Sequence, residues 1–348
     1  MSIIEQFRDC GISQVSITGG EPLIRADFFD IVDRLLAAGI TIKQIYSNGK
    51  LVTPQLLDAF TARRCKPDFH MSFDGLGWHD WLRGVDGAER AVLDAFKLCR
   101  DRGFSTGASM TIHRRNTQTL RDSVNLLGSL GVNSLKTNPV ADAGSWLLNG
   151  GHNSLTTSEI HQVYLNYVPA FFNDGSPLTV MLGGFFKARK GSREYSIPAI
   201  RYSGTCEAER DCVCGHARAN LYIDPDGRAL PCMPMAGIDN VSAGFPLIQD
   251  RGLAACLTDS AYMRFADTRL SALLEHNAEC AHCEYKYYCG GGCRAAALDG
   301  GKAHILGIDR AICCFFKEKW PERIKQKLTN EVKGEIKHPQ WSFGPRVF

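Results

Sequence analysis

Residues 15–50 read VSITGGEPLIRADFFDIVDRLLAAGITIKQIYSNGK and contain the pattern that decides the fold. A short β-rich run, Val15–Thr18, is followed by a glycine turn and by Phe28–Ala38, whose apolar residues have helical spacing and which ends at Gly39. A second β-rich run, Ile42–Ser47, comes next. This order predicts a strand, a crossover helix and a second strand parallel to the first.

The same alternation continues to residue 140. The further β-rich runs are Asp68–Phe73, Thr106–Ile112 and Ser134–Asn138, and the helix-like segments are Pro54–Arg64, Ala88–Arg102 and Thr119–Leu130. Strands that alternate with helices of this length indicate an α/β fold with a parallel sheet. Such sheets bind their ligands at the carboxyl ends of the strands, so we expect functional residues directly after each run.

Length and composition restrict the class of protein. The chain has 348 residues, of which 44% are hydrophobic and 22% charged, and its formal net charge is +3. These values are typical of a globular protein and give no sign of a nucleic-acid partner. The apolar runs, such as Val168–Phe172, are too short to span a membrane, and residues 1–5 lack the features of a signal peptide. We therefore expect a cytoplasmic protein without a membrane or nucleic-acid partner.

Polar residues and glycines follow the first three runs. They are Gly19-Gly20-Glu21-Pro22, Ser47-Asn48-Gly49, and Ser72-Phe73-Asp74-Gly75 with His79-Asp80 and Arg83-Gly84. Paired glycines let a backbone approach a ligand, Glu21 can accept hydrogen bonds from an ammonium group, and Arg83 can bind a carboxylate. Each motif alone is more typical of a turn or an exposed ion pair. Together, at consecutive strand ends, they predict a site for a small ligand with amine, carboxylate and ribose groups.

Over residues 1–140 this succession resembles the partial (β/α)6 barrel, a TIM-type fold, of radical S-adenosylmethionine (SAM) enzymes. The resemblance implies that Gly19, Gly20 and Glu21 contact the amine of SAM. It also implies that Ser47, Asn48 and Ser72 face the ribose or the carboxylate, and that Arg83 contacts the carboxylate.

One motif of that family is missing from the sequence. Radical SAM enzymes hold a catalytic 4Fe–4S cluster with Cys-x3-Cys-x2-Cys after their first strand, and this spacing occurs nowhere in the 348 residues. Only eighteen residues precede Gly19, and they read as a helix end at Ile3–Arg8, a turn and a strand. We expect an incomplete barrel that lacks its first strand and cluster loop through N-terminal truncation, with genuine loss of the cluster as the alternative. The chain as written should not cleave SAM.

The fourteen cysteines are distributed unevenly. Cys10, Cys65 and Cys99 are most simply core thiols, and the other eleven lie between Cys206 and Cys314. Without a sign of export, so dense an array indicates metal binding rather than a disulfide framework. The spacing is Cys206-x5-Cys212-x-Cys214-x12-Gly227-x4-Cys232, then Cys280-x2-Cys283-x5-Cys289-x3-Cys293, then Cys313. Thiolates grouped in fours select zinc or iron–sulfur clusters, and ligand type alone leaves both open.

A turn in this region brings two of the cysteines together. Asp224-Pro225-Asp226-Gly227 predicts a hairpin between Ala219–Ile223 and Arg228–Cys232. Cys214 and Cys232 would then lie at the same end of a two-stranded ribbon.

The complete spacing resembles the SPASM extension of radical SAM enzymes, a small α+β domain that holds two auxiliary 4Fe–4S clusters. The resemblance implies that Cys206, Cys214, Cys232 and Cys293 bind one cluster and that Cys280, Cys283, Cys289 and Cys313 bind the other. Cys212 competes with Cys206 or Cys214 for a place, and Cys314 competes with Cys313. We expect a barrel over 1–140, a connector over 141–205, a SPASM domain over 206–320 and a C-terminal tail over 321–348.

These resemblances imply an enzyme that modifies a side chain of a peptide or protein, with an electron donor such as flavodoxin or ferredoxin. Sulfatase-maturing relatives carry an aspartate near the cysteine that corresponds to Cys280, whereas Glu279 and Ala281 flank it here. We therefore favour a peptide maturase. The alternatives are a sulfatase-maturing type of enzyme, a non-catalytic iron–sulfur protein for electron transfer or binding, and a zinc-stabilised binding module.

Overall fold

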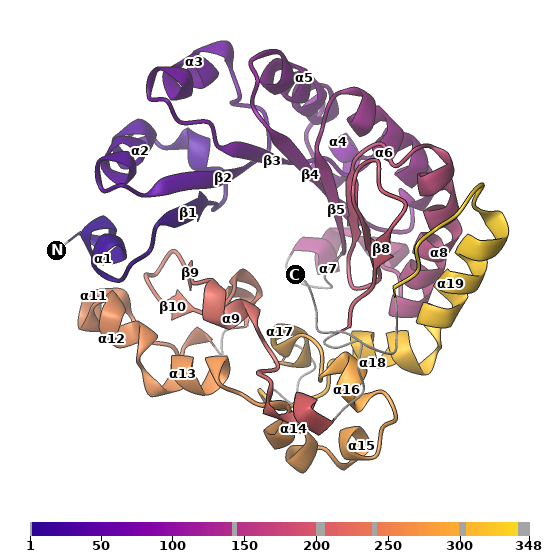
Figure 1. Cartoon of the computed structure of the whole chain (residues 1–348). Helices are drawn as coiled ribbons and strands as arrows, with labels where there is room; N and C mark the ends of the chain where they lie inside the picture. Colours follow the sequence, from indigo (N-terminus) through magenta and orange to yellow (C-terminus); the bar gives the residue numbers. More distant parts are fainter. Residues whose placement is uncertain (1, 141–144, 200–205, 239–241, 299–303, 340–348) are drawn as a thin grey trace. The chain divides into compact units, whose positions relative to one another are not determined.

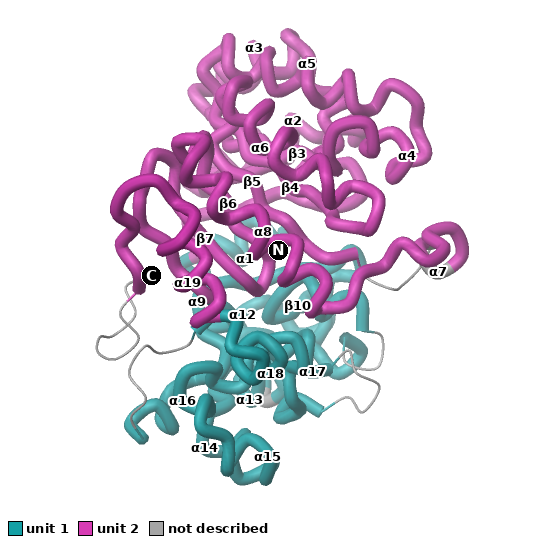
Figure 2. Tube along the Cα trace, turned by 90° about the vertical axis from the view of Figure 1, so that its right-hand side faces the viewer, with its two compact units in different colours: residues 1–11, 198–320, 340–348 teal, residues 12–197, 321–339 magenta. Residues whose placement is uncertain are grey.

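The computed structural model describes residues 2–140, 145–199, 206–238, 242–298 and 304–339. Parts of the expected connector and tail, at 141–144, 200–205 and 340–348, lie outside the described residues. The chain divides into two compact units (Figure 2). Unit 2 comprises residues 12–197 and 321–339, and unit 1 comprises residues 1–11, 198–320 and 340–348.

Unit 2 is built on one eight-stranded sheet whose strands follow the order of the sequence. The strands are β1 (Gln14–Ile17), β2 (Thr41–Ser47), β3 (Asp68–Ser72), β4 (Thr106–Ile112), β5 (Ser134–Pro139), β6 (Thr179–Leu182), β7 (Phe186–Ala188) and β8 (Tyr195–Ser196). Strands β1 to β6 are parallel, and β7 and β8 are antiparallel. The predicted α/β class and the parallel sheet are confirmed. Within the described residues β1 pairs with β2 alone and is an edge strand.

Helices connect the parallel strands. They are α2 (Phe28–Ala37), α3 (Pro54–Ala62), α4 (His79–Arg83), α5 (Ala88–Asp101), α6 (Leu120–Ser129), α7 (Ser145–Asn149) and α8 (Thr157–Asn173), with the 3-10 turns η1 (Pro22–Ile24), η2 (Thr117–Thr119) and η3 (Gly151–Asn153). Helices α2, α3, α5 and α6 lie on one side of the sheet (Figure 1). Local signals set their ends: Thr53 accepts a hydrogen bond from the Leu56 amide and Pro54 begins α3.

The side of the sheet that faces these helices is apolar. Adjacent strands align a row of fully buried residues, Met71, Ala108, Leu135 and Val180. Helix α5 covers its sheet with Val92, Phe96 and Cys99, which are also fully buried and have helical spacing. The next position on each strand gives a second row, Ser72, Ser109, Lys136 and Met181, whose side chains are partly or fully exposed. The strands therefore have one packed face and one accessible face.

The sheet continues past residue 140, where the sequence predicted only a connector. Residues 179–196 supply β6, β7 and β8. These strands are four, three and two residues long, so their period-2 pattern is too brief to stand out in the sequence.

The predicted tail is also part of this unit. Helix α19 (Trp320–Glu331) buries Ile324 and Leu328, and the backbone around its end bonds to Asn173 of α8 at 3.0 Å. The Lys337 amide donates to the Arg193 carbonyl at 2.9 Å. The described part of the tail, up to residue 339, is therefore a packed segment.

Unit 1 consists of short helices and one hairpin. Its helices are α1 (Ile3–Asp9), α9 (His216–Ala219), α11 (Ile248–Arg251), α12 (Leu253–Leu257), α13 (Ser260–Ala266), α14 (Leu270–His276), α15 (Ala278–Ala281), α16 (Lys286–Cys289), α17 (Arg294–Leu298) and α18 (Arg310–Lys317), with the 3-10 turns η4 (Cys206–Arg210) and η5 (Met233–Gly237). Helix α1 joins this unit because the Gln6 side chain accepts from the Leu253 amide at 2.7 Å. The sequence predicts instead that these residues belong to the barrel over 1–140, and unit 1 contains them because of this contact.

The predicted hairpin is confirmed. Strands β9 (Tyr222–Ile223) and β10 (Ala229–Leu230) pair antiparallel, and the Asp224 carboxylate accepts from the amides of Asp226 and Arg228. The hairpin packs on an apolar cluster that includes Tyr262, and Cys214 and Cys232 lie against this cluster. In the described part of the chain no helix is long and apolar enough to cross a membrane.

Candidate functional site

The ends of β1 and β2 are joined through the Glu21 carboxylate. Ser47 donates to its two oxygens at 3.0 and 3.1 Å, and the Asn48 amide donates at 2.7 Å. The Leu23 amide donates at 3.2 Å. The Ser47 hydroxyl has a single proton, which the two oxygens share, so the three donors occupy three of the roughly four acceptor positions of a carboxylate and one remains for a ligand amine. Three of the residues predicted from sequence are thus brought together.

The neighbouring atoms are open to a ligand. A Cβ atom added to Gly19 or Gly20 would meet nothing within 4 Å, and Gly19 has a φ of 151°. The backbone that leads to Glu21 is therefore accessible. The side-chain oxygen of Asn48, Oδ1, accepts from the Lys50 backbone amide at 2.9 Å, while the side-chain nitrogen Nδ2 donates to no described residue. These strand ends offer both acceptors and donors to a ligand.

A second network lies at the ends of β3 and β4 and is centred on Asp74, whose side chain is fully buried. The carboxylate accepts from Arg83 Nε at 2.7 Å and from the Thr111 amide at 2.9 Å, and it lies 3.0 Å from His79 Nδ1. Burial alone would raise its pKa, but the hydrogen bond from His79 and the charge of Arg83 hold the pKa of Asp74 below its ordinary value. Asp74 was quoted in a sequence motif but was not among the predicted site residues.

This network determines what Arg83 can do. Its Nε is bound to Asp74, and its terminal nitrogens donate to none of the described residues. The terminal nitrogens are therefore available to a carboxylate ligand. Ser72 ends β3 two residues before Asp74 and is half-buried on the accessible face. No hydrogen bond between described residues joins Ser72 or Arg83 to Glu21, so the predicted site residues form two separate groups.

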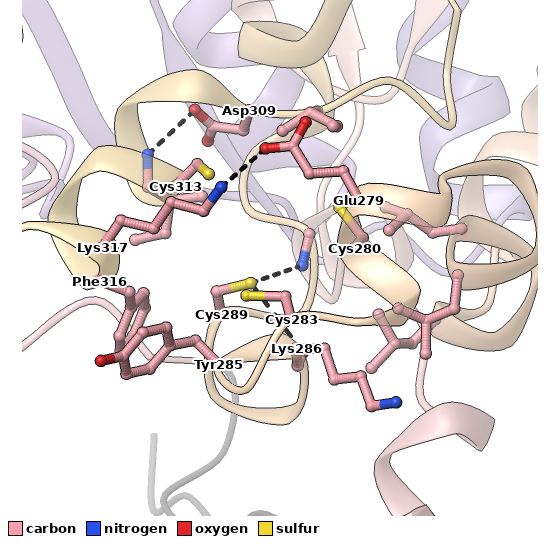
Figure 3. A pocket seen from close by; sticks show the side chains of 16 residues that line it. Glu279, Cys280, Cys283, Tyr285, Lys286, Cys289, Asp309, Cys313, Phe316 and Lys317 are labelled. Atoms are coloured by element: carbon pink, nitrogen blue, oxygen red, sulfur yellow. Dashed lines mark hydrogen bonds and ion pairs between the residues drawn. The ribbon is translucent and has the colours of Figure 1, made fainter.

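In unit 1 four predicted ligands line one pocket (Figure 3). Cys280 comes from α15, Cys283 from the following turn, Cys289 from the end of α16 and Cys313 from α18. The pocket has an empty volume of about 470 Å³, part of which is open to solvent.

The environment of these thiols is apolar and dense in sulfur. Burial, opposed by a hydrogen bond from the Gly291 amide and reinforced by the three other thiols, raises the pKa of Cys289 to about 11. Burial is also the main cause of the raised pKa of Cys280 and Cys313. Buried thiols with raised pKa values are poor nucleophiles without a metal, so the donor set fits metal binding better than nucleophilic catalysis.

The pocket wall depends on a glycine turn. Gly291 and Gly292 have φ values of 81° and 73°, and a Cβ atom at either would collide with Leu273 or Ile312. The buried Arg294 guanidinium donates to the carbonyls of Gly291, Ile305 and Gly307. These hydrogen bonds hold the glycine turn in place, and they use backbone carbonyls instead of the cysteine thiols.

Asp309 connects this pocket with a second group of cysteines. Its carboxylate caps α18, which carries Cys313, and also accepts from the Cys293 amide at 2.8 Å. Burial raises the pKa of Cys232 to about 11, opposed by a backbone hydrogen bond and reinforced by Cys293 and Cys214. Cys214, Cys232 and Cys293 therefore lie near one another.

Cys206 has a neighbour in another part of unit 1. It begins η4 and lies near Tyr287 of α16, whose phenol donates to Glu209 at 2.7 Å. The two cysteines that competed for ligand places have other partners: Cys212 accepts from Arg218 at 3.1 Å, and Cys314 donates to Glu318 at 3.1 Å.

The remaining thiols and acids complete the description. All fourteen cysteines lie in the described part of the chain and are free thiols. In that part no group of three or more His, Cys, Asp or Glu side chains is arranged so that it could hold a single metal ion. Glu279, beside Cys280, is paired with Lys317 at 2.8 Å (Figure 3). It is also paired with Arg310 at 3.1 Å. It is therefore not a free base at the pocket.

The chain is similar to a known family profile and to several known proteins. Residues 1–127 match the profile of the radical SAM superfamily. An AdoMet-dependent heme synthase of Oleidesulfovibrio alaskensis is 24% identical over 92% of this chain and 79% of its own length. The PqqA peptide cyclase of Bradyrhizobium diazoefficiens is 24% identical over 87% and 74%, respectively. The mycofactocin maturase MftC of Mycobacterium tuberculosis is 25% identical over 86% and 70%.

Solved structures share the fold. Native anSMEcpe with bound AdoMet and the Cp18Cys peptide superposes with a TM-score of 0.64 at 16% identity, covering 94% of this chain and 88% of that chain. Streptococcus suis SuiB bound to the precursor peptide SuiA superposes with a TM-score of 0.56 at 13% identity, covering 89% and 67%. Residues 1–127 of this chain therefore match the radical SAM profile, and the chain shares its fold with these structures.

Proposed function

We propose that the chain is a radical SAM enzyme of the peptide maturase type with a C-terminal SPASM domain. The observation that carries the proposal is the convergence of Cys280, Cys283, Cys289 and Cys313 on one pocket of a chain with a radical SAM domain. Peptide-modifying relatives and peptide-bound structures of the same fold support a peptide or protein substrate.

The strand ends of unit 2 would bind SAM. Gly19 and Gly20 present an open backbone, and Glu21 retains one acceptor position for the amine. Ser47, Asn48 and Ser72 would face the ribose or the carboxylate, and the terminal nitrogens of Arg83 would hold the carboxylate. Asp74 would orient Arg83 through its Nε and thereby leave those nitrogens directed at the ligand. The sheet would be the partial (β/α)6 barrel of the family.

The thiols of unit 1 would hold two auxiliary 4Fe–4S clusters. Cys280, Cys283, Cys289 and Cys313 would bind one, and Cys214, Cys232 and Cys293 would bind the other with Cys206 as the predicted fourth ligand. When bound, such clusters supply one-electron transfer or an open iron for substrate. The apolar wall of α14 and the Gly290–Gly292 turn would exclude water from the first of these sites.

The reaction requires one component that these 348 residues do not encode. Without a Cys-x3-Cys-x2-Cys motif the chain offers no family-type site for the catalytic cluster. We therefore expect no 5′-deoxyadenosine from SAM when this chain alone is mixed with a strong reductant. Peptide modification should require those three thiolates and an electron donor such as flavodoxin or ferredoxin, in the cytoplasm.

A second candidate function is favoured by the similarity to AdoMet-dependent heme synthases, whose substrate would be a tetrapyrrole instead of a peptide. A sulfatase-maturing type is disfavoured because Glu279 is already engaged by Lys317 and Arg310. Metal content separates the zinc-stabilised binding module from these enzymes. The non-catalytic iron–sulfur protein is separated from them by the absence of substrate turnover in a chain that carries the catalytic motif.

The test is anaerobic reconstitution followed by metal and sulfide analysis. Two 4Fe–4S clusters predict about eight iron and eight sulfide per chain. Cys283→Ala should lose about half of the iron, whereas Cys10→Ser, outside both thiol groups, should lose none. Bound zinc without sulfide would contradict the proposal. A chain that carries the catalytic motif and then consumes a tetrapyrrole but no peptide would support the second candidate instead.

A further inference from the structure

Three tryptophans and a histidine gather where β3, β4 and β5 end. Trp78 and Trp81 follow β3, His113 directly follows β4, and Trp146 lies in α7 after β5. The ring centroid of Trp81 lies 5.1 Å from His113, 6.2 Å from Trp146 and 6.1 Å from Trp78. We call these four residues the tryptophan cluster. None of them was predicted as a site residue, although all follow strand ends.

His113 is the unusual member of the cluster. Its side chain is fully buried, and neither ring nitrogen has a hydrogen-bond partner among the described residues. Burial lowers its pKa to about 4, opposed by the charge of Asp74, so the ring is neutral at pH 7. A neutral imidazole offers one donor and one acceptor, and leaving both unused costs free energy that a ligand could recover.

The three indole rings of the cluster are largely apolar, and one positive charge, that of Arg115, lies beside them. The Arg115 guanidinium lies 4.5 Å from the ring centre of Trp81 and 5.7 Å from that of Trp78. Arg114 is paired with Glu159 at 3.0 Å. Trp81 is 36% exposed, so part of the aromatic surface is open to solvent.

These features select among peptide side chains. Lysine and arginine would be repelled by Arg115, and a carboxylate would pair with the guanidinium of Arg115 instead of with the neutral imidazole of His113. An aliphatic side chain would leave the imidazole unpartnered. A phenol places a ring against the indoles and a hydroxyl within reach of the imidazole.

We propose that the tryptophan cluster binds a tyrosine side chain of the peptide substrate, with the phenol hydroxyl bonded to His113. The peptide nature of the substrate rests on the proposed function, whereas the preference for a phenol rests on the cluster itself. Trp81, on the five-residue helix α4, packs against the fully buried His113, so the phenol would have to displace Trp81 to reach the imidazole.

The experiment uses the full chain with its five tryptophans replaced by 5-fluorotryptophan. Fluorine NMR follows titration with N-acetyl-tyrosinamide, and the amides of phenylalanine and leucine serve as comparison probes. The resonances of Trp78, Trp81 and Trp146, assigned by single Trp→Phe replacements, should shift with tyrosinamide. Affinity should fall in the order tyrosine, phenylalanine, leucine, with about a fivefold step for the aromatic contact.

Two variants separate the contributions. Trp81→Ala should weaken tyrosinamide binding about fivefold, since it removes one exposed aromatic contact. His113→Phe should keep the affinity for the phenylalanine amide and abolish the preference for tyrosine. Met263→Ala, which removes an exposed apolar side chain of unit 1, should change neither.

Three outcomes would overturn the inference: equal affinity for the leucine amide, shifts confined to the other two tryptophans, or an unchanged affinity in Trp81→Ala. The readout needs no SAM cleavage and is therefore independent of the proposed function. A chain that binds tyrosinamide at the cluster but modifies no peptide would contradict only the proposed function. Peptide modification that is indifferent to a Tyr→Leu change in the peptide would contradict only this inference.

Discussion

The strand-end site of unit 2 and the thiol pocket of unit 1 differ in the interactions that organise their side chains. At the strand ends, Glu21 and Asp74 are surrounded by protein donors, and their hydrogen bonds exist without a ligand. In the thiol pocket, four sulfur atoms share an apolar environment that raises the pKa of Cys280, Cys289 and Cys313. The first site is organised by the fold alone, whereas the second would gain its strongest bonds only with the proposed metal bound.

This contrast gives the largest expected effect. Removing iron from a reconstituted sample should destabilise unit 1 by several kcal/mol, because metal binding there contributes directly to folding. Unit 2 should keep its stability. Hydrogen exchange measured before and after chelation should show lost protection in α14–α18 and unchanged protection in β2–β5. Equal losses in both units would contradict the contrast.

The second prediction concerns the buried Asp74. Asp74→Ala should lower the free energy of unfolding by roughly 3–5 kcal/mol, since it leaves Arg83 and the Thr111 amide without their acceptor. Urea denaturation measures the change. Asp94→Ala, which removes an exposed ion pair on α5, is the matched control and should alter the midpoint little. A small effect of Asp74→Ala would mean that the network does not organise the strand ends.

The third prediction concerns pH. His70 and His113 are buried, and burial lowers the pKa of each to about 4. Below the ordinary histidine pKa of about 6.5 the unfolded chain binds more protons than the folded chain, so stability falls as the pH falls from 6.5 towards 4. Between pH 7 and pH 5 each histidine should cost up to about 2 kcal/mol.

Urea denaturation of His113→Phe at both pH values checks this expectation. The variant should lose less stability on acidification than the parent chain, because phenylalanine binds no proton. The same loss in both would show that His113 is not held neutral by burial.

The smallest effect is expected at the rim of the thiol pocket. Glu279→Gln removes the charge that pairs with Lys317 and Arg310, and all three side chains are largely exposed. Exposed ion pairs contribute little, so the urea midpoint and the iron content should not change measurably. A loss of iron in this variant would assign Glu279 a part in holding the cluster.

Local sequence predicted the units of the sheet well. The strand Thr106–Ile112 has the predicted bounds, and α2, α3 and α5 end within two residues of their predicted ends. The reason is that each element carries its own signal: a β-branched run, a helical apolar period, a cap or a glycine stop. Cysteine spacing likewise singled out the four cysteines among the residues that line the thiol pocket.

The tertiary structure decided what depends on contacts between distant segments. It added β6–β8 and α19 to the sheet unit, and it made Asp74 the centre of a network with Thr111. It also gathered the tryptophan cluster from three strand ends and placed Cys206 near Tyr287 of α16. Sequence periodicity reports on a residue's own element, whereas these arrangements arise from packing between elements that are separated along the chain.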